Sequence, residues 1–174
     1  MEKVAKGYVI EDSKVKILFT NRTVDAKNSD DVKRVCEEYN FNYTNLMYNT
    51  QVHGAAVRVI KTIDDKENNG EEADGLLTSL KNVPLLIFTA DCVPLVFYDS
   101  EKEVVGLAHA GWRGTYDNIA EEIIEVLVND YNCRKENIKV IIGPSVSGDS
   151  YEVSHELVEK FAVHNIDNYY KKCG

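Results

Sequence analysis

Three side chains that bind borderline-soft metal ions stand where apolar segments meet loops. They are His53 in Gln-Val-His-Gly, Cys92 in Thr-Ala-Asp-Cys-Val-Pro and His109 in His-Ala-Gly-Trp-Arg-Gly. Loops at strand ends are the usual places where a rigid scaffold presents reactive groups. Two imidazoles and one thiolate form a ligand set that suits Zn²⁺ and leaves a fourth position open. Such an ion lowers the pKa of a bound water and polarises a substrate oxygen.

The same residues allow other interpretations. The three ligands are far apart in the sequence, and no CxxC or HExxH motif is present. A metal-free site would use Cys92 as nucleophile and His53 or His109 as its base. A purely structural alternative is a buried cysteine with two hydrogen-bonded histidines. Asp91 precedes Cys92 and could orient a metal ligand, whereas the Ala-Asp-Gly turn at Asp74 is either structural or reaches a substrate hydroxyl.

The turn that carries Gly111, Arg113 and Gly114 is suited to binding a small anion. It runs from a predicted strand into a helix that we expect to begin near Thr115. Thr115 and Asp117 are the two candidate N-cap residues of this helix. Helix N-termini offer free N–H groups, and glycine lets an anion approach the backbone. Arg113 adds a planar donor fork for phosphate or carboxylate. The alternative is an ordinary turn with the arginine in a surface ion pair.

Composition restricts the partners. The chain has 174 residues, with 20 Lys+Arg against 29 Asp+Glu and a net charge of −9. This balance opposes general nucleic-acid binding, and no apolar run approaches the roughly 20 residues that span a bilayer. No signal peptide opens the chain, so we expect a cytoplasmic protein with reduced thiols. Cys36, Cys133 and Cys173 have ordinary structural explanations, on a helix face, in a loop and at the chain end.

A sheet with separate helices must position these groups. Strands are predicted at Val15–Phe19, Val52–Ile60, Leu85–Thr89, Leu95–Tyr98, Val104–Ala108 and Val140–Ile142. The sequence Asp-Ser-Glu-Lys at 99–102 predicts a hairpin between two of them. Helical periodicity covers Val32–Tyr39, Ile119–Leu127 and Ser154–Ala162. These signals predict an α+β fold with a mixed sheet in one domain, with a doubly wound α/β fold as the alternative.

Together these motifs resemble the laccase-domain family, whose members are also described as multicopper polyphenol oxidase-like proteins and purine nucleoside phosphorylases. The matching stretches include Ala-Asp-Gly at 73–75, Gly-Pro at 143–144 and Tyr-Glu-Val at 151–153. The resemblance implies a mixed-sheet α/β/β/α layered sandwich over 1–174. It also implies zinc, or copper, at His53, Cys92 and His109. Two departures are the missing glycines around Arg22 and an end at Gly174, before the family's further helix and strand.

The resemblance further implies phosphorolysis of adenosine, inosine and methylthioadenosine, with adenosine deamination as a second activity. Phosphate would then bind Arg113, Gly111 and Gly114, and the chemistry would use Arg113 with Cys92 and Asp91. Alternatives are a metal-free Cys/His hydrolase, including one that edits peptidoglycan precursors, and a binding module without activity. Copper-dependent phenol oxidation is the weakest, because a multicopper cluster needs more histidines than the chain's four.

Overall fold

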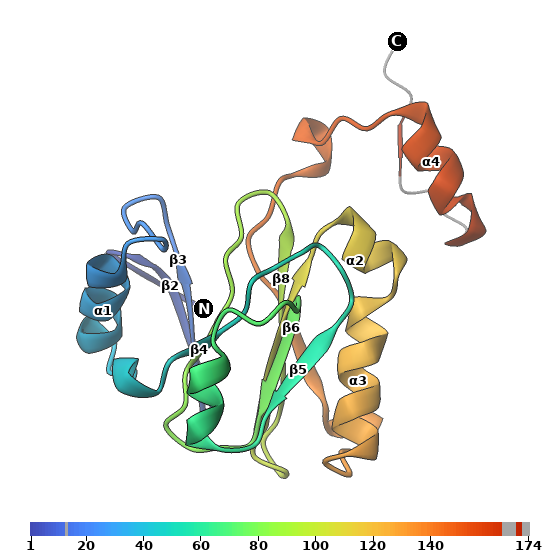
Figure 1. Cartoon of the computed structure of the whole chain (residues 1–174). Helices are drawn as coiled ribbons and strands as arrows, with labels where there is room; N and C mark the ends of the chain where they lie inside the picture. Colours follow the sequence, from blue (N-terminus) through green and yellow to red (C-terminus); the bar gives the residue numbers. More distant parts are fainter. Residues whose placement is uncertain (13, 165–169, 172–174) are drawn as a thin grey trace.

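The computed structural model describes residues 1–12, 14–164 and 170–171, and its centre is a five-stranded sheet (Figure 1). The strand order is β10 (Lys139–Ile142), β8 (Val93–Asp99), β9 (Val104–Ala110), β6 (Gly75–Thr78) and β5 (Val57–Ile60). Within this sheet β5 and β6 are parallel, and the other neighbours are antiparallel. The sheet is therefore mixed, as predicted, and is not doubly wound.

The predicted hairpin at 99–102 is confirmed. Asp99 at the end of β8 pairs with Val104 at the start of β9. The Asp99 carboxylate accepts the backbone N–H groups of Glu101 at 2.8 Å and Lys102 at 3.1 Å. A short aspartate side chain stabilises a turn in this way because it satisfies N–H groups that have no ladder partner.

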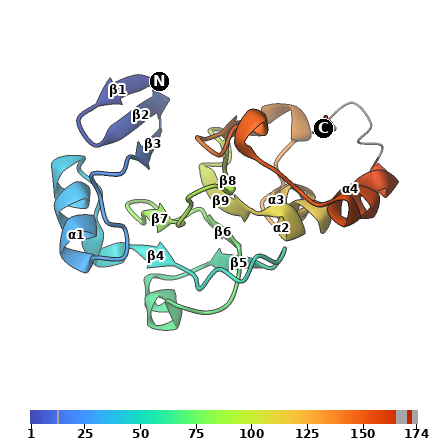
Figure 2. The same ribbon diagram turned by 90° about the horizontal axis from the view of Figure 1, so that it is seen from above.

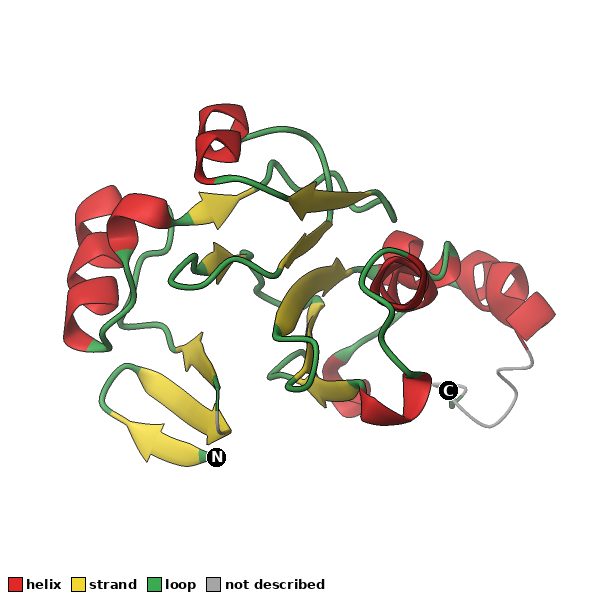
Figure 3. Cartoon of the chain, turned by 90° about the horizontal axis from the view of Figure 1, so that it is seen from below, coloured by secondary structure: helices red, strands yellow, loops and turns green. Residues whose placement is uncertain are grey.

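The five-stranded sheet has a helix on one face and a second, smaller sheet on the other. On one side, Ile119, Ile123 and Leu127 of α3 (Ile119–Asn129) are fully buried against the five-stranded sheet. On the other side, a small three-stranded sheet packs against the five-stranded sheet, and its Ile17 contacts a cluster that includes Val96 and Tyr98 of β8. The small sheet consists of β1 (Glu2–Val4), β2 (Gly7–Asp12) and β3 (Val15–Thr20), and α1 (Ser29–Glu38) lies beside it (Figures 1 and 3). The fold is therefore the predicted layered α+β arrangement.

The predicted strand over 52–60 is wrong in its first half. β5 begins only at Val57. The backbone N–H groups of Val52, His53 and Gly54 donate to the side chain of Asp74 and not to a neighbouring strand. The predicted strand over 85–89 shortens to β7 (Leu85–Leu86), which pairs in parallel with β4 (Met47–Tyr48). Short 3₁₀ turns occupy Tyr43–Asn45, Ile63–Asn68, Lys135–Asn137, Gly148–Ser150 and Ala162–His164.

The helix expected to begin near Thr115 is two helices. The first, α2 (Trp112–Tyr116), begins after Gly111, and α3 begins after Asn118. Asn118 has a left-handed φ of 59°, which breaks the helix because it turns the chain out of the right-handed α region. The predicted caps at Thr115 and Asp117 are therefore wrong.

The last described helix, α4 (His155–Phe161), is confirmed in its start. The Ser154 hydroxyl accepts the N–H of Leu157 at 3.3 Å, the usual geometry of a serine cap. Figure 2 shows α4 beside α2, on the opposite side of the molecule from the small sheet. Among the helices that the structure describes, none is long and apolar enough to cross a membrane. Cys36, Cys92 and Cys133 are free thiols, and Cys173 lies outside the described residues.

Candidate metal centre

The structure brings the three predicted ligands together. One nitrogen of His53, the Cys92 Sγ atom and one nitrogen of His109 all lie within 4.8 Å of one another. The two imidazole rings stand edge to face, with centroids 4.7 Å apart and planes at 80°. His53 lies in the loop before β5, Cys92 just before β8 and His109 near the end of β9. The cluster therefore lies at the ends of these strands, on the side of the sheet where α2 starts (Figure 1).

The register of the antiparallel strands explains this convergence. Pro94 pairs with His109 and Val93 with Ala110, so Cys92 continues the same register opposite Gly111. Cys92 and His109 are then diagonal neighbours on one face of the sheet, a separation that longer side chains span. Gly111 offers no side chain in that position, and the space is left to the thiol.

Asp74 is the carboxylate that orients the cluster. It is 1% exposed, and its carboxylate lies 2.7 Å from Nδ1 of His109. The same carboxylate accepts the N–H groups of Val52, His53 and Gly54 at 3.1, 3.0 and 2.7 Å. An ionised carboxylate can only accept hydrogen bonds, so Nδ1 of His109 carries the proton. Its Nε2 lone pair is then free to bind a metal.

The orienting role predicted for Asp91 therefore belongs to Asp74. Asp91 is exposed, and in the described part of the chain no hydrogen bond joins its side chain to a ligand of the cluster. Its backbone carbonyl instead accepts the N–H of Val146 at 3.1 Å. The only sign of Asp74 in the sequence is the Ala-Asp-Gly turn. That turn does not encode the partner of Asp74, His109, because the pairing of β6 with β9 brings the two residues together.

His53 adopts a backbone conformation that is uncommon for a residue with a side chain. Its φ is 62°, in the left-handed region that costs a non-glycine residue about 1–3 kcal/mol. The three hydrogen bonds from 52–54 to Asp74 hold the loop in this state. His53 is exposed, Cys92 half-buried and His109 buried, so the cluster opens to solvent on the His53 side.

Gln51 is a second residue that supports the cluster. Its amide donates to the carbonyl of Phe88 and accepts the N–H of Phe88, both at 2.7 Å. The side chain thereby imitates a pair of strand hydrogen bonds. It ties the loop that carries His53 to the segment that leads to Cys92, and its position two residues before His53 was the only signal in the sequence.

Gly111 and Gly114 permit close packing against the ligand loops. A Cβ atom at Gly111 would lie 2.9 Å from Cδ2 of His53 and 3.2 Å from Sγ of Cys92, and one at Gly114 would lie 2.7 Å from the carbonyl oxygen of Gly54. Because α2 has only five residues, its summed dipole is small. The glycines therefore have a packing role that does not depend on an anion.

The thiol of Cys92 is not in the surroundings of an activated nucleophile. Burial raises its pKa, and the negative charges of Asp91 and Asp74 raise the pKa further. Nucleophilic cysteines instead lie in electropositive surroundings that lower the pKa. A divalent cation between the thiol and the two imidazoles would reverse this effect, because it favours the thiolate.

Arg113 is exposed on α2, two residues after Gly111. Its Cζ atom lies 5.0 Å from the ring centroid of Trp112, which is half-buried and outside the main core. Among the described residues no carboxylate oxygen lies within 4.0 Å of its guanidinium group, so the alternative of a surface ion pair is not observed.

Comparison with known proteins identifies the family. A family model described as multi-copper polyphenol oxidoreductase laccase matches residues 21–173. A purine nucleoside phosphorylase YlmD of Bacillus subtilis is 34% identical over 82% of this chain and 54% of its own length. An adenosine deaminase RL5 from an unknown prokaryotic organism is 37% identical over 67% of this chain and 46% of its own.

Solved structures of similar proteins have the same fold as this chain. The crystal structure of YlmD from Geobacillus stearothermophilus superposes with a TM-score of 0.73 at 30% identity, over 78% of this chain and 52% of that one. The chain thus spans about half the length of the relatives it matches. With the family model matching almost the whole sequence, the chain belongs to the multi-copper polyphenol oxidoreductase laccase family.

Proposed function

We propose that this chain acts on purine nucleosides, with phosphorolysis as the main reaction, at a zinc ion held by His53, Cys92 and His109. The observation that carries the proposal is the convergence of these three donor atoms within 4.8 Å, with Asp74 fixing the ring of His109. The relatives named purine nucleoside phosphorylase and adenosine deaminase support the substrate class.

The donor set fits zinc. One thiolate and two neutral imidazoles suit a borderline-soft ion, and three protein ligands leave a position free, as in catalytic zinc sites. Gly111 leaves room for the ring of His53 and the thiol of Cys92 to face one point. A multicopper cluster would need additional imidazole ligands, and the described residues place two histidines in this group.

When bound, the ion supplies Lewis-acid polarisation of a substrate oxygen or of water. In phosphorolysis, a phosphate oxygen bonds to the anomeric carbon of the ribose. The bond from that carbon to the purine nitrogen breaks, and the purine leaves with the electron pair and takes up a proton. Arg113 would bind the phosphate, because a guanidinium group donates two parallel hydrogen bonds to such an anion.

The test is release of hypoxanthine and ribose 1-phosphate from inosine and phosphate by zinc-loaded protein. Cys92→Ala is the negative control, since it removes a proposed metal ligand. Cys133→Ala is the matched control, because it removes a buried thiol outside the cluster. We expect turnover by the native chain and by Cys133→Ala, and none by Cys92→Ala. No product above the Cys92→Ala background would rule out phosphorolysis by this chain.

Adenosine deamination is the second candidate, favoured by the relative of that name at 37% identity. Asp91 is exposed and adjacent to Cys92, and we propose it as the general acid for this reaction. Ammonia released from adenosine without phosphate would identify deamination, and Asp91→Asn should slow ammonia release while leaving zinc content unchanged.

A metal-free Cys/His hydrolase is the alternative from another class, and a peptidoglycan precursor would be its substrate. The raised pKa of Cys92 argues against it, because the thiol would stay protonated at neutral pH. Elemental analysis of protein purified without added metal distinguishes the two. One zinc per chain supports the metal centre, and activity in fully demetallated protein supports the hydrolase.

A further inference from the structure

Two cations from distant parts of the chain lie against the same indole ring. Trp112 is the only tryptophan in the sequence. Arg113 Cζ is 5.0 Å from its ring centroid, and Lys160 Nζ of α4 is 5.1 Å from it. The turn around Arg113 predicts an anion site from sequence, whereas no sequence pattern indicates that Lys160 belongs to it.

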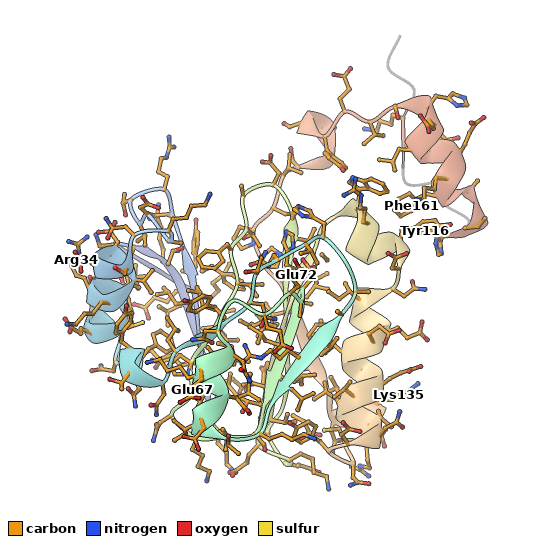
Figure 4. The ribbon with its side chains drawn as sticks, viewed as in Figure 1. Arg34, Glu67, Glu72, Tyr116, Lys135 and Phe161 are labelled. Carbon is orange, nitrogen blue, oxygen red and sulfur yellow. The ribbon has the colours of Figure 1, made fainter. Side chains whose placement is uncertain are left out.

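Aromatic packing fixes the position of Lys160. Its Nζ atom also lies 4.6 Å from the ring of Tyr116. Phe161, the next residue of α4, stacks edge to face on Tyr116 with centroids 5.4 Å apart, and His164 follows at 5.2 Å. Figure 4 shows Tyr116 and Phe161 facing each other at the junction of α2 and α4. The lysine is therefore held beside α2 by its neighbours in α4.

Within residues 1–12, 14–164 and 170–171, neither cation has an acidic partner. Both side chains are exposed, and within the described ranges no carboxylate oxygen lies within 4.0 Å of either. The chain carries 29 acidic against 20 basic residues, so two cations at one ring with no carboxylate among the described residues beside them are a local exception. Two positive charges at one ring repel each other, and a bound anion would remove that repulsion.

Contact with the ring leaves most donors of both groups free. An ammonium group has three N–H donors and a guanidinium group five, and a cation that faces an aromatic ring directs only part of them toward it. Charge-assisted hydrogen bonds to a phosphate oxygen are short and strong. The remaining N–H groups of Arg113 and Lys160 are available for such bonds.

We infer that Arg113 and Lys160 together bind inorganic phosphate beside Trp112. This inference rests on the proposed function and adds to it the second cation of the phosphate site. Gly111, the residue before Trp112, approaches both His53 and Cys92, so α2 connects the inferred phosphate site with the candidate metal cluster. The site needs both α2 (Trp112–Tyr116) and α4 (His155–Phe161), which are far apart in the sequence.

Because Trp112 is the only tryptophan, its fluorescence reports binding without any turnover. The experiment is titration of the full, zinc-loaded chain with inorganic phosphate at constant ionic strength, following tryptophan emission. We expect a saturable change whose apparent Kd rises about 10-fold in Lys160→Met and in Arg113→Met, the lower end for loss of a charged hydrogen bond. Lys135→Met is the matched control, since Lys135 lies at the opposite end of α3 (Figure 4), and its Kd should stay unchanged.

Lys160→Arg separates binding from packing, because it keeps the charge and the cation–ring contact. We expect it to retain phosphate binding. The inference is overturned by the absence of a saturable phosphate signal, by a native Kd in Lys160→Met, or by equal loss in Lys160→Arg and Lys160→Met. Phosphate binding without inosine turnover would refute the phosphorylase proposal alone. Turnover with an unchanged phosphate KM in Lys160→Met would refute the anion site alone.

Discussion

Asp74 holds His109 at two points. Its carboxylate lies 2.7 Å from Nδ1 of the imidazole, and its backbone carbonyl accepts the N–H of His109 at 2.8 Å. Both contacts follow from the pairing of β6 with β9, in which Gly75 is opposite Ala108 and Asp74 is therefore opposite His109. Since the same carboxylate also accepts the backbone N–H of His53, one buried residue contacts two of the three candidate metal ligands.

Asp74→Asn should weaken zinc binding while leaving most of the fold intact. Asparagine keeps the size of the side chain but places an NH₂ group among donors that need an acceptor. Loss of such a supporting partner lowers metal affinity by about 10- to 100-fold. Competition with a chromophoric chelator measures the zinc Kd. Asp99→Asn, at a buried carboxylate that caps the hairpin turn, is the control and should retain native affinity; a native Kd in Asp74→Asn would contradict the positioning role.

Cys92→Ser should abolish tight zinc binding, because a hydroxyl is a far poorer ligand than a thiolate for this ion. Circular dichroism should show a native spectrum, as expected where the metal site is catalytic. Cys36→Ser provides the comparison, since Cys36 is buried on α1 away from the cluster. Stoichiometric zinc in purified Cys92→Ser would exclude Cys92 as a ligand.

Gly111→Ala tests the close approach of α2 to the cluster. The added methyl group would lie 2.9 Å from the ring of His53 and 3.2 Å from the sulfur of Cys92, so one of them must move. We expect zinc affinity to fall at least tenfold, a loss of about 1.4 kcal/mol. Gly148→Ala adds the same methyl group where nothing lies within 4 Å and should bind zinc normally. Equal affinities in the two variants would show that the cluster tolerates the shift.

Gln51→Glu tests the tie between the two ligand loops. The glutamate can no longer donate to the carbonyl of Phe88, and it places two acceptors against each other where the native contact is 2.7 Å. A buried acceptor left unpaired costs about 1–3 kcal/mol. The free energy of unfolding from urea titration of the apo protein should fall by that order. Gln51→Glu with native stability would mean that the amide pairing contributes nothing measurable.

The sequence by itself determined the local features. The turn at Asp99, the periodicity of α1 and α3 and the cap at Ser154 are each encoded within a few neighbouring residues, and the structure agrees with them. The three side chains that the structure brings together were also recognisable, because imidazole and thiolate groups beside glycine and proline mark strand ends. Ordinary local chemistry sufficed for these predictions.

Only the tertiary structure decided which residues support the ligands. Asp91 adjoins Cys92 in sequence, yet the register of β6 on β9 selects Asp74, and no local pattern encodes a register between distant strands. The loop at 52–56 reads as a strand by composition, but the buried carboxylate of Asp74 takes up its N–H groups. Likewise, Lys160 meets Trp112 through packing between α2 and α4, because long-range contacts depend on how complete elements pack together.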